Sequence, residues 1–449
     1  MANTPYINRK IDDDLLLWMR EENRKPLLLR GARQVGKSSA VKHLAEQFEY
    51  FLEINFESNS EVRDLFAKGD LSPYKLCQEL ATIYQMPVIP GKTLLFFDEI
   101  QSSIQAISSL RFFYEEYGEL HVIAAGSLLE FAFQEIPSFG VGRVRSMFMY
   151  PMSFFEFLNA CNHQLLLQAI QKADCKNPLS EAVHKKAVEL LRIFFILGGM
   201  PEVVSAYVNG SDLLSCQRIL DDLIISLRSD FTKYKKKVST SRLSVVFDSV
   251  TAQMGKKFVY TNISNDYNSR QLKEGMELLI MSGLVIPVVH SAANGIPLGA
   301  EIDNKKKKLL LLDTGIFQRL LGLPLSDLLI SNDFSLINKG NIAELFAGLE
   351  ILKSSSCYEK KNLYYWHREN KSSNAEVDFV IQNGQNIVPI EVKSSSKGAM
   401  QSMRLFMGEK QSSFGIRTSL ENFGELAGIK IVPLYALGDF IANHTNLTS

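Results

Sequence analysis

A glycine-rich segment near the N-terminus has residue types that can bind phosphate. Residues 31–38 read GARQVGKS, with an apolar run before them and a helical pattern after them. Glycines let backbone N–H groups turn toward phosphate oxygens, a lysine can reach the β- and γ-phosphates, and a serine hydroxyl can bind Mg²⁺. The strand–loop–helix order is the one that this chemistry requires. We therefore predict a triphosphate cradle formed by Gly31, Ala32, Arg33, Gln34, Val35, Gly36, Lys37, Ser38 and Ser39.

A pair of acidic residues further along the chain fits the same chemistry. Residues 92–101 read KTLLFFDEIQ, and the four apolar residues are typical of a strand buried on both faces of a parallel sheet. Asp98 and Glu99 follow at the carboxyl end of this strand, where open α/β sheets bind their ligands. We predict that Asp98 belongs to the Mg²⁺ shell and that Glu99 is the base that polarises the attacking water.

Two further polar residues are weaker candidates for the same site. Ser127 ends the expected strand at 120–127, where a hydroxyl would sense the γ-phosphate, although it could equally cap the following helix. Arg143 could act on phosphate, either within its own subunit or across subunits of a homo-oligomer. A surface position is the alternative for Arg143.

The C-terminal part of the chain contains a predicted β-hairpin. Residues 376–393 read EVDFVIQNGQNIVPIEVK, and Asn383-Gly384 between two β-rich runs is a strong signal for a two-residue turn. Counting outward from that turn pairs residue 382 with 385 and places Glu376 opposite Glu391.

This hairpin would gather carboxylates and a lysine on one face. The alternation of side chains places Asp378, Glu391 and Lys393 on the same side of the hairpin. Asp378 and Glu391 would hold Mg²⁺, and Lys393 would steady the attacking water or the developing charge in phosphodiester cleavage. A charged, solvated hairpin face is the alternative.

The remaining pattern predicts an α/β protein. Apolar runs at 50–57, 120–127 and 143–150 extend the parallel sheet, and residues 151–240 show helical spacing. Residues 242–313 read as helix, turn, helix and then two extended pieces, an order that fits both a DNA-reading winged helix and a structural linker. The run Lys305–Lys308 would be a basic wing or a solvated loop.

The composition limits the class of protein. The chain has 449 residues with 49 basic and 49 acidic side chains, so no whole-protein field attracts nucleic acid or an anionic membrane. The five cysteines are scattered, and no apolar stretch is long enough to cross a bilayer. We expect a cytoplasmic protein that does not bind membranes.

Several motifs together resemble one family. The chain is similar to AAA-type ATPases of bacteria and archaea that carry an uncharacterised C-terminal domain, on the segments GARQVGKS, LLFFDEIQ, AAGSLLEF, VGRV, YPMSFFEFL, ILGGMPEVV and EVDFVI…PIEVK. The resemblance implies a P-loop core with an extra strand between its two nucleotide motifs. It also implies a helical lid, a winged-helix-like segment and a nuclease-like C-terminal fold.

The C-terminal pattern resembles the Asp…Glu-x-Lys core of restriction-endonuclease-like nucleases. That resemblance implies a further helical carboxylate at Glu344. We expect four parts: a P-loop core at 1–160, a lid at 161–240, a winged-helix-like segment at 241–325 and the nuclease-like domain at 326–449.

The expected function is ATP hydrolysis with Mg²⁺ that controls the C-terminal domain, with DNA or RNA as a candidate partner. An ATP-regulated nuclease and a nucleotide-dependent switch or scaffold with little turnover are the alternatives.

Overall fold

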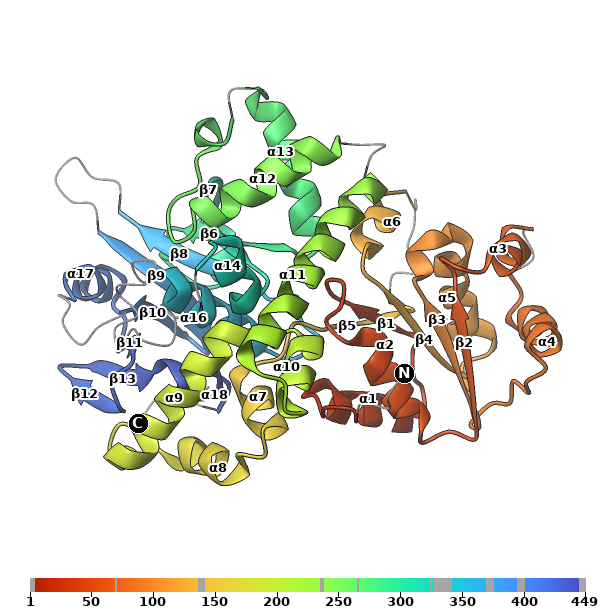
Figure 1. Ribbon diagram of the computed structural model, residues 1–449, viewed down its shortest axis with the longest axis horizontal. Coiled ribbons are helices and arrows are strands. Elements are labelled where there is room, and N and C mark those ends of the chain that lie inside the picture. The colour runs from red at the N-terminus through yellow and green to blue at the C-terminus, as the bar shows by residue number, and fades with distance from the viewer. Residues whose placement is uncertain are drawn as a thin grey trace. The chain divides into compact units, whose positions relative to one another are not determined.

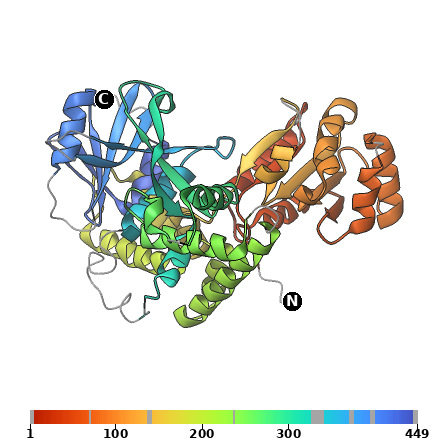
Figure 2. The same cartoon turned by 90° about the horizontal axis from the view of Figure 1, so that it is seen from above.

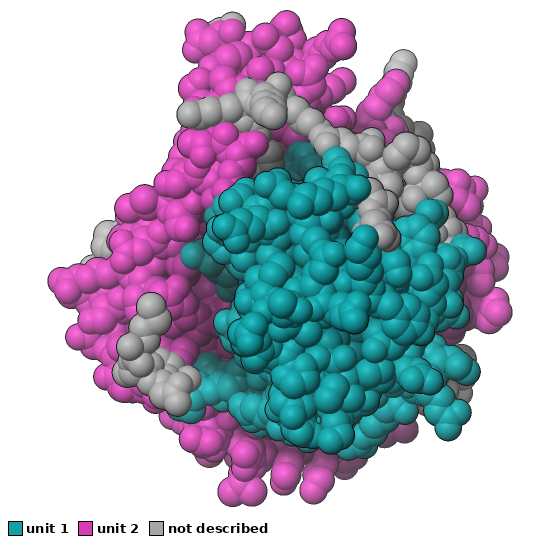
Figure 3. Space-filling model, turned by 90° about the vertical axis from the view of Figure 1, so that its right-hand side faces the viewer, with its two compact units in different colours: residues 1–150, 281–283, 356–360 teal, residues 151–280, 284–355, 361–449 magenta. Residues whose placement is uncertain are grey.

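The chain folds into two compact units in a computed structural model (Figure 3). One unit contains residues 1–150, 281–283 and 356–360, and the second contains 151–280, 284–355 and 361–449. The structure describes residues 5–68, 71–135, 142–234, 238–264, 266–323, 325, 341–368, 375–393 and 400–443.

The first unit is built on a parallel sheet of five strands (Figure 1). The strand order is β2-β3-β4-β1-β5, so β4 lies between the two strands that lead into the glycine loop and the acidic pair. All six residues of β4 are buried, as expected for a strand covered on both faces. The predicted α/β fold is therefore confirmed. The strands are β1 (Leu27–Arg30), β2 (Tyr50–Asn55), β3 (Thr93–Asp98), β4 (His121–Gly126) and β5 (Arg145–Phe148).

Helices pack on both faces of this sheet (Figures 1 and 2). On one face, the rings of Phe56, Phe66, Phe97 and Phe113 pack edge to face within a buried apolar cluster. This packing fixes the end of β3, where the acidic pair lies. The helices are α1 (Ile11–Arg20), α2 (Lys37–Ala45), α3 (Ser60–Ala67), α4 (Pro73–Tyr84), α5 (Ile104–Glu116) and α6 (Leu129–Glu135).

The second unit contains a mixed sheet of eight strands in the order β12-β13-β11-β10-β9-β8-β6-β7. The β6–β7 pair is antiparallel, and β6 also pairs in parallel with β8. The strands are β6 (Val285–Ser291), β7 (Ile302–Leu311), β8 (Leu363–His367), β9 (Glu376–Asn383), β10 (Asn386–Val392), β11 (Gly415–Ser419), β12 (Gly424–Leu426) and β13 (Ile429–Pro433).

Three helices of the second unit, α7, α9 and α16, meet in an aromatic core. The rings of Phe154, Phe194 and Phe346 pack edge to face and are buried. The helices are α7 (Phe154–Ala160), α8 (Gln164–Lys172), α9 (Glu181–Leu197), α10 (Pro201–Val208), α11 (Leu213–Ser229), α12 (Thr240–Ala252), α13 (Ser269–Met281), α14 (Thr314–Leu320), α16 (Asn341–Lys353), α17 (Gln401–Lys410) and α18 (Leu437–Asn443).

The two extended pieces of the winged-helix-like pattern lie in this large sheet. Helices α12 and α13 and the strands β6 and β7 follow in the predicted order, but β6 joins the hairpin to the C-terminal strands through β8. The backbone N–H and C=O groups along the edge of β6 need hydrogen-bond partners, and β8 provides them. The predicted boundaries at 160, 240 and 325 stay a prediction.

The hairpin of β9 and β10 has a different register from the predicted one. Asn383 pairs with Asn386, so the loop is Gly384–Gln385 and not Asn383–Gly384. Gly384 has a φ of +58°, and a turn of this kind needs glycine at its first loop position. Extending the pairing by one step places Asp378 opposite Glu391, where Glu376 was expected.

Candidate nucleotide-binding site

The glycine loop connects the buried strand β1 with the N-terminus of α2. Gly36 precedes the helix with a left-handed backbone, φ +98°, and Gln34 is also left-handed at +62°. Gly31 lies so close to the backbone just after β5 that an added Cβ would be 2.2 Å from the carbonyl oxygen of Met149. Only glycine fits there, so the backbone of this loop is held in a fixed shape.

Lys37 is buried at the start of α2. Its Nζ donates hydrogen bonds to the carbonyl oxygens of Gly31 at 3.0 Å and Ala32 at 2.7 Å. Burial lowers the pKa of Lys37 to about 8, and the nearby charges of Glu99 and Asp98 oppose this shift. The ammonium is therefore bound by neutral carbonyls and has no carboxylate in direct contact among the ion pairs that the structure describes. Such a cation, next to a helix N-terminus, favours an anionic ligand.

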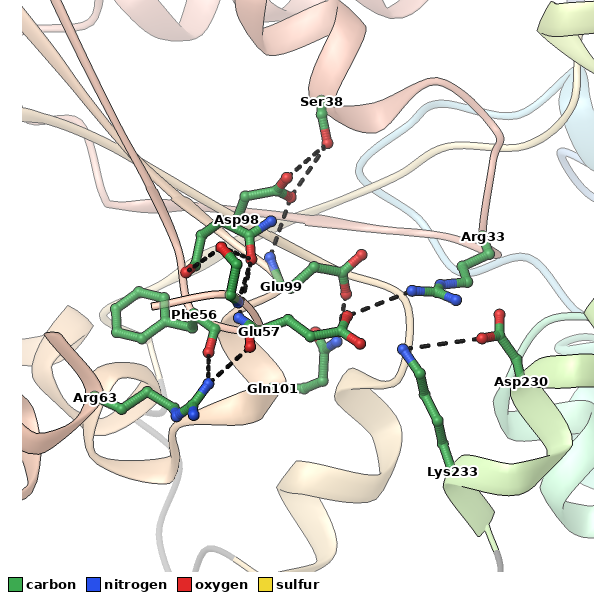
Figure 4. A network of polar contacts seen from close by, with 12 residues as sticks. Arg33, Ser38, Phe56, Glu57, Arg63, Asp98, Glu99, Gln101, Asp230 and Lys233 are labelled. Atoms are coloured by element: carbon green, nitrogen blue, oxygen red, sulfur yellow. Dashed lines mark hydrogen bonds and ion pairs between the residues drawn. The ribbon is translucent and has the colours of Figure 1, made fainter. Parts of the chain in front are cut away.

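Ser38 and Asp98 are brought together as predicted. The Ser38 hydroxyl lies 3.1 and 3.2 Å from the two carboxylate oxygens of Asp98, and the Glu99 N–H donates to Asp98 at 3.1 Å (Figure 4). Burial raises the pKa of Asp98, and the neighbouring charge of Glu99 adds to the effect. A hydroxyl and a half-buried carboxylate are oxygen ligands of the kind that Mg²⁺ prefers.

Glu99 follows β3 in a left-handed conformation with a φ of +49°, which is uncommon for a residue with a side chain. Its carboxylate accepts a hydrogen bond from Gln101 Nε2 (Figure 4). An uncommon backbone geometry of this sort is typical of functional positions.

Gln101 is a residue of this site that the sequence reasoning missed. Its side-chain oxygen is buried and has no hydrogen-bond partner among the described residues, and an added Cβ on Gly126 would lie 2.2 Å from it. Gln101 thus lies between the ends of β3 and β4 and orients Glu99. Its place two residues after the acidic pair was the available signal.

Ser127 lies at the same edge of the sheet as the loop. Arg30 of β1 pairs with Gly126 of β4, so Ser127 follows at the level of Gly31. Its side chain is buried, and its hydroxyl has no hydrogen-bond partner among the described residues. The helix-cap alternative receives no support from these contacts, because a capping hydroxyl would accept a backbone N–H.

The two arginine candidates form ion pairs at the surface. Arg143 is exposed and pairs with Glu115. Arg33 pairs with Glu57 at 3.4 Å, beside Glu99 in Figure 4. The structure does not bring Arg143 to the glycine loop through any hydrogen bond or ion pair between described residues.

The C-terminal candidates form ion pairs with lysines. Glu344 and Asp378 both pair with Lys308, and Glu391 pairs with Lys393 at 2.5 Å. Asp378 also accepts the Val392 N–H at 2.9 Å. Within the described residues, no group of three or more His, Cys, Asp or Glu side chains is arranged to hold a metal ion. The Mg²⁺ site at Asp378 and Glu391 stays a prediction.

Two carboxylates in this region have pKa values shifted by burial. Burial raises the pKa of Glu344 to about 7, with the charge of Lys308 opposing the shift. Burial also raises the pKa of Glu391, against the effect of its partner Lys393. Both shifts show that these carboxylates lie in a site with little water.

Family models match three parts of the chain. Residues 23–158 match a family described as an AAA domain, and residues 188–327 and 339–437 match two families described as domains of unknown function. Together with the glycine loop and the parallel sheet, the first match supports an ATP-binding AAA-type ATPase domain in this part of the chain. The third match gives no support for a restriction-endonuclease-like fold.

Solved structures of low sequence identity are also similar. The Walker-type ATPase PABY2304 of Pyrococcus abyssi has 14% identity and a TM-score of 0.45, and the match covers 70% of this chain and 96% of that one. Aeropyrum pernix ORC1 in complex with DNA has 12% identity and a TM-score of 0.28, and the match covers 72% of this chain and 93% of that one. A single-residue variant of Thermotoga maritima RuvB has 12% identity and a TM-score of 0.27, and the match covers 67% of this chain and 93% of that one. Because these TM-scores are low, we base the assignment on the family model and the loop geometry.

No curated protein matches the chain. Among the described residues, no helix has the length and apolar character needed to span a membrane.

Proposed function

We propose that the first unit hydrolyses ATP with Mg²⁺ at the glycine loop. The observation that carries this proposal is the buried ammonium of Lys37, which is bound only by carbonyl oxygens in the described contacts and lies at the N-terminus of α2. A buried cation with neutral partners is costly unless an anion joins it, and a triphosphate provides that anion.

Each residue has a distinct role in this proposal. The residues of the glycine loop and Ser39 bind the phosphates, and Lys37 contacts the β- and γ-phosphates. Ser38 and Asp98, which already contact each other, would hold Mg²⁺. When bound, the metal neutralises charge that develops on the phosphates. Glu99, oriented by Gln101, accepts a proton from the attacking water, and Ser127 contacts the γ-phosphate.

The proposal is tested by ATP turnover of the wild type, Lys37→Ala and Glu99→Gln. We expect Lys37→Ala to lose both binding and turnover, and Glu99→Gln to keep binding while losing turnover. Tight binding with negligible turnover in the wild type would favour the switch or scaffold alternative. Equal turnover by the wild type and Glu99→Gln would end the assignment of Glu99 as base.

We further propose that the nucleotide state controls the second unit through two short chain segments. Residues 281–283 and 356–360 belong to the first unit by their contacts, yet they lead directly into β6 and β8. These two strands are neighbours in the large sheet, where Val288 pairs with Leu363. A movement of the first unit would therefore act on two adjacent strands at once.

One of these segments is tied to the strand that precedes the glycine loop. Lys360 pairs with Glu130 at 3.2 Å, and Glu130 also pairs with Arg30, the last residue of β1. The Phe148 N–H of β5 donates to the carbonyl oxygen of Cys357 at 2.7 Å. Amide hydrogen exchange with and without an ATP analogue tests the coupling. We expect changed exchange in β6 and β8 of the wild type and a smaller change in Lys360→Met.

Nucleic-acid cleavage comes second to ATP hydrolysis in this proposal. Asp378, the residue on which cleavage would depend, is ion-paired with Lys308. A plasmid and RNA cleavage assay in Mg²⁺, with Asp378→Ala as control, separates the two functions. Arg143 remains a proposed phosphate contact across subunits, and the expected readout is a loss of turnover in Arg143→Ala that depends on protein concentration.

A further inference from the structure

A buried lysine lies in the middle of the C-terminal carboxylates. Lys308 of β7 is 1% exposed, and its Nζ lies 2.5 Å from Glu376 Oε1, 2.9 Å from Glu344 Oε1 and 3.5 Å from Asp378 Oδ1. Glu376 and Asp378 come from β9, and Glu344 comes from α16. Three carboxylates from two elements thus converge on one ammonium group, and we call this set the carboxylate cage.

Other groups close the cage around the ammonium. The ring of Tyr365, a buried residue of β8, has its centroid 5.5 Å from Lys308 Nζ. The backbone at Gly255 lies against one of the carboxylates, because an added Cβ there would be 3.0 Å from Glu344 Oε2. The ammonium therefore occupies the space among the carboxylate oxygens, and a second cation would compete with it for the same oxygens.

We propose that Lys308 is the resident cation of the carboxylate cage, in the place where a hydrolytic site would hold a divalent metal ion. The three carboxylates are partly buried, with 13% to 35% of each side chain exposed. Neighbouring carboxylates repel one another, and the buried ammonium provides their positive partner. A divalent ion at Asp378 would have to approach this buried positive charge. The cage is an ionic lock that joins β7, β9 and α16, and the wild-type chain takes no metal ion there.

Removing the amine of Lys308 should free the carboxylates of the cage for a metal ion. Among the described residues of the wild type, no three acidic side chains are arranged to hold a metal ion. Three carboxylates nevertheless contact one ammonium, and without the amine of Lys308 their oxygens would be left to turn toward one divalent ion. Carboxylate oxygens are the ligands that Mg²⁺ and Mn²⁺ prefer. Lys308→Ala should therefore create a divalent-cation site that the wild type lacks. Lys305 belongs to the same run of lysines but is exposed, so Lys305→Ala is the matched control.

The test is Mn²⁺ binding to the nucleotide-free full chain, measured by electron paramagnetic resonance. The variants are Lys308→Ala, Lys305→Ala, Asp378→Asn and the double variant Lys308→Ala with Asp378→Asn. The glycine loop contributes the same background in every variant. We expect the wild type, Lys305→Ala and Asp378→Asn to bind equally, Lys308→Ala to gain a site, and the double variant to lose this gain.

Two results would overturn the proposal. One is Mn²⁺ binding by the wild type that Asp378→Asn abolishes, because the cage would then already hold a metal. The other is a folded Lys308→Ala, judged by circular dichroism, that gains no site. If Lys308→Ala unfolds while Lys308→Arg stays folded, the lock is supported, and the comparison of the wild type with Asp378→Asn still decides the question of the metal.

Discussion

Two buried lysines in this chain are close to carboxylates, and their immediate partners differ. Lys37 contacts the carbonyl oxygens of Gly31 and Ala32, with Asp98 and Glu99 nearby as charges only. Lys308 contacts three carboxylates directly. The pKa of Lys37 is lowered to about 8, mainly by burial. For Lys308 burial also acts to lower the pKa, but the charge of Glu344 and its neighbours outweighs it and the pKa is raised.

The difference shows how a ligand site can be told from a structural ion pair. A buried ammonium whose partners are neutral still has charge to share with a ligand, as at the glycine loop. A buried ammonium that is surrounded by carboxylates is already compensated, as in the carboxylate cage. The first arrangement fits an anion-binding site, and the second fits a stabilising one.

The largest expected effect is on the chemistry of the first unit. Glu99→Gln should lower the ATP turnover rate by about 10²- to 10⁴-fold, the usual contribution of a general base. ATP affinity should stay close to that of the wild type, because Lys37 and Asp98 are unchanged. Single-turnover hydrolysis and calorimetric binding measure the two quantities. A parallel loss of affinity would instead mean that Glu99 holds the nucleotide.

Removing the cation of the carboxylate cage should lower the free energy of unfolding. Lys308→Met should lower the free energy of unfolding by about 1–3 kcal/mol, because it leaves three neighbouring, partly buried carboxylates without their cation. Lys305→Met, the same substitution at an exposed position of β7, should change it by less than about 0.5 kcal/mol. Urea unfolding of both variants measures the difference. Equal effects would mean that the cage is not a lock.

Lys308 also shows where sequence reasoning ends. Four consecutive lysines at 305–308 have the same local pattern, so a basic wing or a solvated loop was a reasonable interpretation. Lys308 is the buried lysine of this run because of its place in the alternation of β7 and because Glu344 of α16 and Glu376 of β9 contact it. Neither feature can be read from the four lysines alone. The hairpin register was wrong for a related reason, since the position of Gly384 within the turn is a backbone property.

The lowered pKa of Lys37 should appear in the pH dependence of ATP affinity. Lys37 loses its proton as pH rises through about 8, so the ammonium that we propose binds the triphosphate is lost above that pH. ATP affinity should therefore be nearly constant below about pH 7, fall to about half its full value at pH 8 and be about tenfold lower by pH 9. Lys37→Arg stays protonated and should show no such fall, whatever its own affinity. A wild-type affinity that is flat across this range would contradict the lowered pKa of Lys37.

The smallest expected effects are those of Ser127, the proposed γ-phosphate contact, and Arg143. Ser127→Ala should lower the turnover rate by about 2- to 10-fold, the value of one hydrogen bond. Arg143→Ala, measured at a protein concentration too low for subunits to associate, should have a smaller effect, because Arg143 is exposed and pairs with Glu115. Steady-state ATP turnover measures both variants. A larger loss in Arg143→Ala under these conditions would reverse the order of the two assignments.

The site of the first unit was predictable because its motifs are short and continuous in the sequence. The glycine loop, the buried strand before it and the acidic pair after β3 are each encoded by consecutive residues, and their parallel strands bring them to one edge. Gln101 escaped prediction because its contact with Glu99 depends on a left-handed backbone. The grouping of 281–283 and 356–360 with the first unit could not be read from the sequence, since it depends on contacts between distant segments.

The most direct test of the central claim is calorimetric titration of the folded full chain with ATP and Mg²⁺, beside Lys37→Ala. We expect about one nucleotide bound per chain in the wild type and none detectable in the variant, because the buried ammonium is the main positive charge offered to the phosphates. Absence of uptake by the folded wild type, or equal uptake by Lys37→Ala, would contradict the account.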